Sequence, residues 1–168
     1  MVSYILAVVT GAIVLATDQF TKYLVKTNFE IGKSYDFLPG FVNFTYIHNT
    51  GGAWGMLRGY TWLLLSVTIV VMLVCMALLL KCGAKNKVMF WSIMLILSGG
   101  LGNMIDRLFR GGLVVDFLQF DFWQDFPVFN IADCAIVIGC GLLILHFILD
   151  WIKEKKEKKV STDANNNA

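Results

Sequence analysis

Two aspartates stand out because each follows an apolar stretch and has no cation nearby in the chain. Asp116 follows Leu113-Val114-Val115, and Asp133 follows Phe129-Asn130-Ile131-Ala132. Two desolvated carboxylates that face each other cannot both ionise easily, so one keeps a proton and the pair titrates as a unit. An aspartic peptidase uses such a pair: one carboxylate takes a proton from water and the other donates to the scissile carbonyl. From spacing alone, a proton or cation relay in a membrane bundle is an equal alternative.

Other aspartates in the chain have cations at helical spacing. Lys22 follows Asp18 by four residues and Arg110 follows Asp106 by four, a spacing that favours ion pairs on a helix. We interpret the first pair as structural, and Asp106 as structural rather than catalytic. A fifth acid, Asp36, belongs more loosely to the same set. A charge at mid-bilayer costs about 2.5–3.5 kcal/mol even on the lenient insertion scale, so acids in such a chain have partners or a function.

The elements that position these acids follow from the hydropathy pattern. The chain has 168 residues, of which 57% are hydrophobic and 15% charged, whereas a soluble domain is about one-quarter charged. The apolar residues gather in four runs: Met1 to Thr17, Gly59 to Leu80, Val88 to Ile105 and Pro127 to Leu149. A membrane-spanning helix needs about 20 apolar residues, so we expect the first helix to continue through Asp18 toward Val25. This run has no basic n-region, which favours a retained helix over a cleaved signal peptide.

The basic residues predict the orientation of the bundle. Lys81, Lys85 and Lys87 lie between the second and third runs, and five more lysines lie between positions 153 and 159. Under the positive-inside rule both segments are cytoplasmic, and four helices then place the N-terminus inside as well. Segments 26–58 and 107–126 therefore face outward, although the first also carries three basic residues. Asp116 and Asp133 are expected at this outer face.

The first outward segment is not helical in pattern. Pro39-Gly40 indicates a turn, the aromatic and β-branched run Phe41 to Ile47 indicates a strand, and Asn49 to Gly52 reads as a second turn. Leu113-Val114-Val115 is a further possible strand. The predicted fold is an all-α membrane protein of four transmembrane helices with a small extracytoplasmic β element. Residues 1–159 form one domain, and the polar segment 160–168 is expected to be disordered.

Several kinds of chemistry lack their motifs. The chain has no G-x-S-x-G, no glycine-rich phosphate loop and no H-E-x-x-H, and it has only two histidines. We therefore expect no metal, no cofactor and no nucleic-acid partner. A small transporter would need a polar path across the bilayer, and the second run is apolar apart from Thr and Ser. A structural or assembly protein is the other alternative, and it predicts that Asp116→Asn and Asp133→Asn are nearly neutral.

Five short motifs, in this order, resemble those of the signal peptidase II (lipoprotein signal peptidase) family. They are Asp18-Gln19-x-x-Lys22, the loop Asn49-Thr50-Gly51-Gly52-Ala53-Trp54-Gly55, Gly102-Asn103-x-x-Asp106-Arg107, Val114-Val115-Asp116-Phe117 and Phe129-Asn130-x-Ala132-Asp133. The resemblance covers roughly Val14 to Ile138. Gly52 stands where the family often has Ala and Trp54 where it often has Phe, so the departures concern the fit of the substrate.

The resemblance implies an aspartyl endopeptidase in the bacterial cytoplasmic (inner) membrane. Its substrate would be a diacylated prolipoprotein cleaved just before the lipidated cysteine, with membrane lipid around it and no metal or cofactor. Asp116 and Asp133 match the catalytic pair of the family. The residues expected to bind substrate or support the active site are Asp18, Lys22, Asn49, Gly51, Asn103, Asp106, Arg107 and Asn130.

Overall fold

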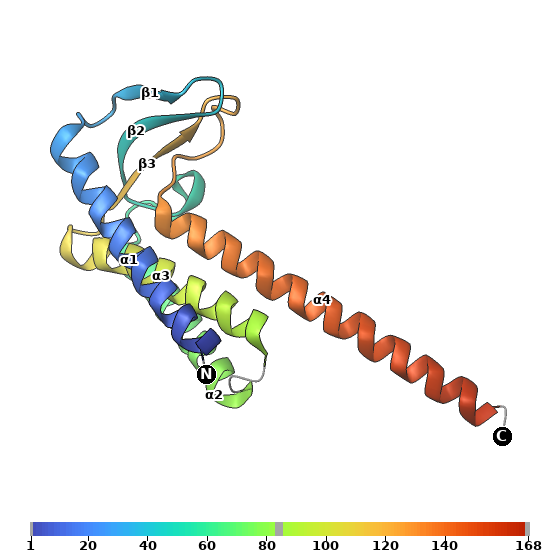
Figure 1. Ribbon diagram of the computed structural model, residues 1–168. Coiled ribbons are helices and arrows are strands. Elements are labelled where there is room, and N and C mark those ends of the chain that lie inside the picture. The colour runs from blue at the N-terminus through green and yellow to red at the C-terminus, as the bar shows by residue number, and fades with distance from the viewer. Residues whose placement is uncertain (1, 83–85, 167–168) are drawn as a thin grey trace.

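The protein is described by a computed structural model that covers residues 2–82 and 86–166, with side chains for 2–81 and 86–159. Lys85, one of the predicted cytoplasmic charges, lies outside the described residues. Within them, four helices are long and apolar enough to cross a membrane. Figure 1 shows these helices with a small β-sheet at one end of the bundle. The four predicted spans are therefore present.

The helices are α1 (Val2–Asn28), α2 (Thr61–Cys82), α3 (Lys87–Phe109) and α4 (Ile131–Asn166). The expected continuation of the first helix past Asp18 is confirmed, because α1 ends only at Asn28. Helix α3 is central and packs against each of the other three. A Cβ atom on Gly99 would collide with the carbonyl oxygen of Ala132, so this glycine lets α4 approach α3 closely.

The sheet has three antiparallel strands in the order β1-β2-β3. Strand β2 (Val42–Asn49) is the strand predicted from aromatic and β-branched residues, and β3 (Val114–Phe120) extends the predicted Leu113–Val115 segment. Strand β1 (Ser34–Leu38) was not expected, because its sequence has no clear alternation and pairing with β2 supplies its order. The sheet is joined to α1 through a core cluster of Val25, Tyr46, Val115 and Phe117.

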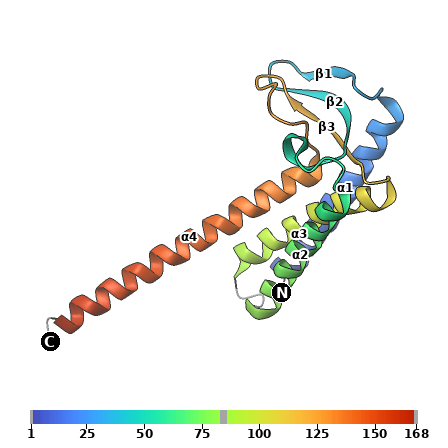
Figure 2. The same ribbon diagram turned by 180° about the vertical axis from the view of Figure 1, so that it is seen from behind.

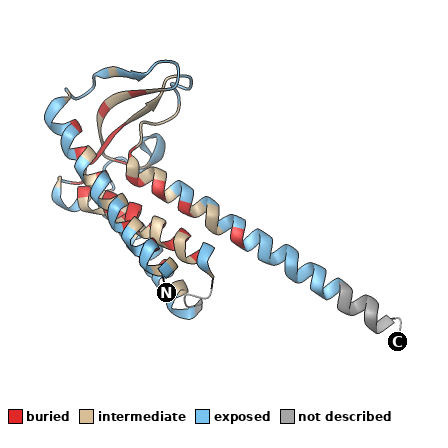
Figure 3. Ribbon diagram, viewed as in Figure 1, coloured by how far each residue is buried: buried red, intermediate tan, exposed pale blue. Residues whose placement is uncertain are grey.

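Helix α4 begins later than the hydropathy suggests. The predicted run starts at Pro127, but Phe129 forms a bridge with Leu118 of β3, and α4 begins only at Ile131. Asp133 is consequently in the first turn of α4. At its other end α4 diverges from the remaining helices and its surface is exposed (Figure 3). The helix reaches Asn166 and so includes most of the segment for which composition predicts disorder.

Candidate active site

The two cation-free aspartates meet in one cavity beneath the sheet. Asp116 lies on β3 and Asp133 in the first turn of α4, and both line a cavity of about 520 Å³. The side chain of Asp116 is buried and that of Asp133 is half-buried. Neither carboxylate forms a salt bridge with another of the residues whose side chains are described. The fold therefore brings together two carboxylates that are 17 residues apart in sequence and leaves both without a cation in direct contact.

Local hydrogen bonds at the start of α4 fix Asp133. The backbone N–H of Asp133 donates to Oδ1 of Asn130 at 2.9 Å, and the backbone N–H of Asn130 donates to Oδ2 of Asp133 at 3.1 Å. This reciprocal pair is a capping box, which satisfies free N–H groups at a helix N-terminus. The carboxylate of Asp133 also lies where the helix dipole favours negative charge. The N-x-x-D spacing is thus both a helix start and part of the site.

Asp116 is held by two side-chain amides. Asn49 Nδ2 donates to Oδ2 of Asp116 at 2.8 Å, and Asn130 Nδ2 donates to Oδ1 at 2.6 Å. Burial and, secondly, the negative charge of Asp133 raise the pKa of Asp116 from its usual value to about 7, although the two amides and the charge of Lys22 act in the opposite direction. Asp116 therefore gains or loses its proton near neutral pH.

A second pair of carboxylates, Asp18 and Asp106, lies beside the first and is ion-paired with Lys22; Asp106 also forms the predicted pair with Arg110, whose Nε is 3.4 Å from Oδ1 of Asp106. Lys22 Nζ is 2.9 Å from Oδ2 of Asp18 and 3.1 Å from Oδ2 of Asp106, and all three side chains are essentially inaccessible. The predicted ion pair between Asp18 and Lys22 is present. Asp18 also accepts a hydrogen bond from the backbone N–H of Ala132 at 2.9 Å, and Asp106 from that of Val115 at 3.1 Å. The ion-paired acids therefore hold the two segments that carry Asp116 and Asp133.

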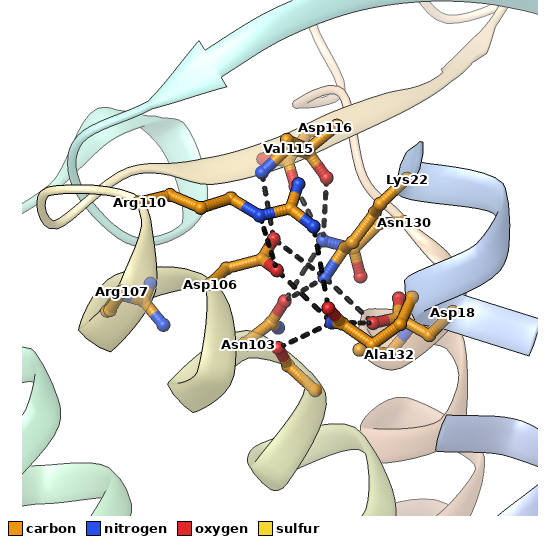
Figure 4. A network of polar contacts seen from close by, with 12 residues as sticks. Asp18, Lys22, Asn103, Asp106, Arg107, Arg110, Val115, Asp116, Asn130 and Ala132 are labelled. Carbon is orange, nitrogen blue, oxygen red and sulfur yellow. Dashed lines mark hydrogen bonds and ion pairs between the residues drawn. The ribbon is translucent and has the colours of Figure 1, made fainter. Parts of the chain in front are cut away.

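Asn103 connects the two groups, as Figure 4 shows. Its Oδ1 accepts from Lys22 Nζ at 3.0 Å and from Asn130 Nδ2 at 3.1 Å, while its Nδ2 donates to Oδ1 of Asp133 at 2.7 Å. An ammonium group can only donate, so Lys22 fixes which end of the Asn103 amide faces Asp133. One continuous network joins α1, α3, β3 and α4.

The loop after β2 supplies another wall of the cavity. The backbone N–H of Gly51 donates to Oδ1 of Asn49 at 2.8 Å, which directs the Asn49 amino group toward Asp116. A Cβ atom on Gly51 would lie 2.6 Å from the carbonyl oxygen of Met56, so the loop requires glycine there. Arg107 donates to the carbonyl oxygen of Gly51 at 3.0 Å and lies to one side of the network in Figure 4.

The sequence reasoning missed some residues of the site. Gln19 Nε2 donates to Asp18, to the Gly102 carbonyl and to Asp106, each at 3.1 Å. The position of Gln19 between Asp18 and Lys22 in the first motif could have indicated that it belongs to the site. Aromatic side chains also line the cavity: Trp54, Phe120, Phe126 and Phe129. For Phe120 and Phe126 the available signal was the alternation of acids with aromatics between Phe117 and Phe126. Among the residues the structure describes, no cluster of His, Cys, Asp or Glu is placed to hold a metal ion.

Apolar helices with a half-enclosed carboxylate pair at one end define a multi-pass membrane protein with a site suited to acid–base chemistry. Comparison of sequences makes this more specific: the family model described as "Signal peptidase (SPase) II" matches residues 10–149. The chain therefore belongs to the signal peptidase II family and is a peptidase.

Curated relatives cover nearly the whole chain. A lipoprotein signal peptidase from Halalkalibacterium halodurans is 40% identical over 94% of this chain and 99% of its own length. One from Enterococcus faecalis is 39% identical over 91% of this chain and 93% of its own length. One from Staphylococcus aureus is 38% identical over 92% of this chain and 94% of its own length.

Solved structures show the same architecture. A bacterial membrane enzyme determined by the in meso method at 2.3 Å resolution superposes with a TM-score of 0.81 at 38% identity, covering 89% of this chain and 90% of that one. A second, at 1.9 Å resolution, has a TM-score of 0.76 at 38% identity and covers 88% of this chain and 93% of that one. The fold is that of bacterial membrane enzymes.

Proposed function

We propose that this protein is an aspartic endopeptidase that removes the signal peptide from diacylglyceryl-modified prolipoproteins by cleaving before the lipidated cysteine. The observation that carries the aspartic mechanism is the pair Asp116 and Asp133, which share one largely apolar cavity and have only amide and backbone N–H partners. The substrate class is taken from the relatives, which are lipoprotein signal peptidases.

The environments of the two carboxylates give them different roles. The pKa of Asp116 is raised to about 7, so Asp116 holds the proton. Asp133 lies at the N-terminus of α4 and is the ionised member. Asp133 takes a proton from water as the water oxygen attacks the scissile carbonyl carbon. Asp116 gives its proton to the carbonyl oxygen, and a neutral tetrahedral intermediate forms.

The same two groups complete the reaction in reverse roles. Asp133, now protonated, donates to the leaving nitrogen of the cysteine as the carbon–nitrogen bond breaks. Asp116 takes back the proton from one hydroxyl group of the intermediate as the new carboxyl group forms. Each aspartate then has its starting protonation state, and no metal or cofactor takes part.

The remaining polar residues orient the pair and the substrate. Asn49, Asn103 and Asn130 donate to the two carboxylates and so set their orientation. Arg107 and the Gly51 loop also line the cavity, where they can bind the substrate backbone. The ion-paired residues act indirectly, because their contacts fix the ends of β3 and α4 that carry the two aspartates: Asp18, Lys22 and Asp106.

The proposal includes an orientation in the membrane. The N-terminus and the distal end of α4 point away from the end of the bundle that carries the sheet and the site (Figures 1 and 2). Lys81 and Lys87 lie at the ends of α2 and α3 far from the site, and further lysines lie on the distal part of α4. The termini are then cytoplasmic and the carboxylate pair lies near the outer surface, where a lipid-tethered cysteine would be held.

The experiment that tests this function is cleavage of a diacylated prolipoprotein by the purified protein in detergent. Asp116→Asn and Asp133→Asn are each expected to lower kcat by at least about a thousandfold, because each removes a proton-transfer group. Asp36→Asn is the matched control, since Asp36 lies exposed on β1 outside the cavity. Thermal unfolding in the same detergent checks that all variants are folded.

The outcomes separate the alternatives. Cleavage by wild type and Asp36→Asn alone would support the peptidase and both members of its pair. Equal cleavage by all four proteins would show that residues other than these aspartates carry out the chemistry. A well-folded wild type that cleaves neither lipidated nor unlipidated precursor would contradict the proposed substrate.

A further inference from the structure

A second, smaller cleft of about 230 Å³ runs from the catalytic cavity into the apolar part of the bundle. Its walls come from α2, α3 and α4, and it shares Asn103, Arg107 and Ile136 with the cavity that holds the carboxylate pair. The two spaces therefore adjoin each other, and a molecule bound at the carboxylates lies next to this cleft.

One face of α3 forms the floor of the cleft. Arg107, Asn103, Gly100 and Ile96 all line it, and they follow one another at helical spacing along one side of α3. At 1.5 Å per residue this face is about 16 Å long. It is polar at the end near the catalytic cavity and apolar at the other, as a lipid is.

The cleft opens sideways to the surroundings of the bundle. Val67 and Val71 of α2 form one edge, and their exposed fractions are 52% and 45%. Gly100 on the floor is itself buried, and a Cβ atom there would lie 3.7 Å from Met72 and 3.8 Å from Thr68, in ordinary van der Waals contact with α2. The cleft is therefore narrow at Gly100, and a side chain larger than that of alanine there would extend into it.

We propose that this cleft binds one acyl chain of the diacylglyceryl group on the substrate cysteine. The proposal rests on the function proposed above. A helical signal peptide is too wide for the cleft, because a helix 16 Å long fills a cylinder of roughly 1,200 Å³. A single hydrocarbon chain is narrow enough, and its ester group then lies beside Arg107. The Nε of Arg107 is buried and has no hydrogen-bond partner among the described residues, so it is available to an ester oxygen.

The cleft positions the lipid and adds little to the affinity. Acyl chains of the bilayer are as apolar as leucine side chains, so moving a chain from the bilayer into the cleft gains mainly packing contacts. A chain fixed there would, however, restrict where its cysteine can lie relative to Asp116 and Asp133. Cleavage of substrates whose acyl chains are too short to reach Gly100 should not be affected by a substitution at that residue.

The test fills the cleft and compares two substrates that differ only in acyl length. Gly100→Leu places a side chain above the floor, and Val71→Trp fills the same space from the α2 edge. Gly141→Leu is the matched control, because a Cβ atom on Gly141 of α4 has no atom within 4 Å. The substrates are one prolipoprotein with two palmitoyl chains and the same prolipoprotein with two butanoyl chains.

We expect both cleft variants to lower kcat/KM for the palmitoyl substrate roughly tenfold, the size of effect that apolar pockets give. The kcat/KM for the butanoyl substrate should stay within about twofold of wild type, as should the values of Gly141→Leu for both substrates. An equal fall for both substrates would overturn the proposal and assign the cleft to the peptide, and no fall for either would show that the substrate does not enter it. If wild type cleaves neither substrate, the proposed function itself has failed, whereas the other outcomes all require cleavage by wild type.

Discussion

The site contains two pairs of aspartates, and they differ in whether a cation contacts them. Asp18 and Asp106 surround Lys22, whose ammonium group lies within 3.1 Å of both. Asp116 and Asp133 are joined to the same network, but only through amides and backbone N–H groups. Asp116 is buried almost as fully as Asp18 and Asp106. Burial alone therefore does not distinguish Asp116 from Asp18 and Asp106, whereas contact with a cation does.

The two pairs of aspartates are therefore suited to different roles, one structural and one chemical. The ion-paired carboxylates make fixed contacts, and these hold Val115 and Ala132, each next to one of the paired aspartates. Asp116, which is buried without a cation in contact, has a raised pKa. In the proposed mechanism the ion-paired carboxylates therefore maintain the geometry, while Asp116 and Asp133 transfer protons.

The largest change in stability is expected from removing Lys22, the cation that Asp18 and Asp106 share. Lys22→Met leaves Asp18 and Asp106 buried without their common partner, and we expect a loss of about 3–5 kcal/mol in the free energy of unfolding. Denaturant unfolding in detergent, followed by tryptophan fluorescence, measures it.

The matched control for this variant is Lys33→Met. Lys33 also pairs with an acid, Glu30, at 2.8 Å, but both side chains are mostly exposed, and such a pair contributes no more than about 1 kcal/mol. Similar losses for the two variants would mean that the buried network does not hold the site together.

A smaller effect is expected where the two groups meet, at Asn130. Asn130→Ala removes the donor to Asp116 and the side-chain cap of α4. Loss of a positioned donor lowers kcat about a hundredfold, and loss of an N-cap lowers stability by about 1 kcal/mol. Cleavage assays and unfolding of the same protein sample separate the two effects.

Asn86 provides a cap of the same kind far from the site. It precedes α3, and its side chain accepts from the backbone N–H of Met89 at 3.1 Å. Asn86→Ala should cost a similar stability while kcat stays that of wild type. If its kcat falls as far as that of Asn130→Ala, the loss reflects general destabilisation and not the orientation of Asp116.

The smallest expected effect is a shift in the pH dependence of kcat/KM, which reports which aspartate of the pair holds the proton. In the proposed mechanism Asp116 acts with its proton, so kcat/KM should fall as the pH rises through about 7, the pKa of Asp116. The hydrogen bond from Asn49 favours the ionised form and so lowers this pKa. Asn49→Ala removes that bond, raises the pKa and should move the falling limb to higher pH, whatever the change in the maximum rate.

Asn43 of the same strand is the control for the pH profile. Its amide donates to Asp121 at 3.0 Å, away from the carboxylate pair, so Asn43→Ala should leave the limb where wild type has it. A limb that stays in place or moves to lower pH in Asn49→Ala would contradict the assignment of the proton to Asp116.

Much of the fold could be predicted because its signals are local. Apolar runs with charged ends predicted the four spans, and the continuation of α1 through Asp18 and Lys22 followed from the length that a membrane helix needs. The run of aromatic and β-branched residues predicted β2. Strand β1 and the start of α4 could not be predicted this way, because pairing with β2 orders the one and a bridge between Phe129 and Leu118 delays the other.

For the site, the sequence by itself determined which acids have a cation one helical turn away and which have none, since spacing along a helix is enough to show it. It could not determine that Lys22 also reaches Asp106, or that Asn103 joins this ion-paired group to Asp133. Lys22 and Asn103 are 81 residues apart, and their contact exists only because α1 packs against α3. Tertiary packing thus decided how deeply each carboxylate is buried and which atoms solvate it, and these two quantities set where its proton resides.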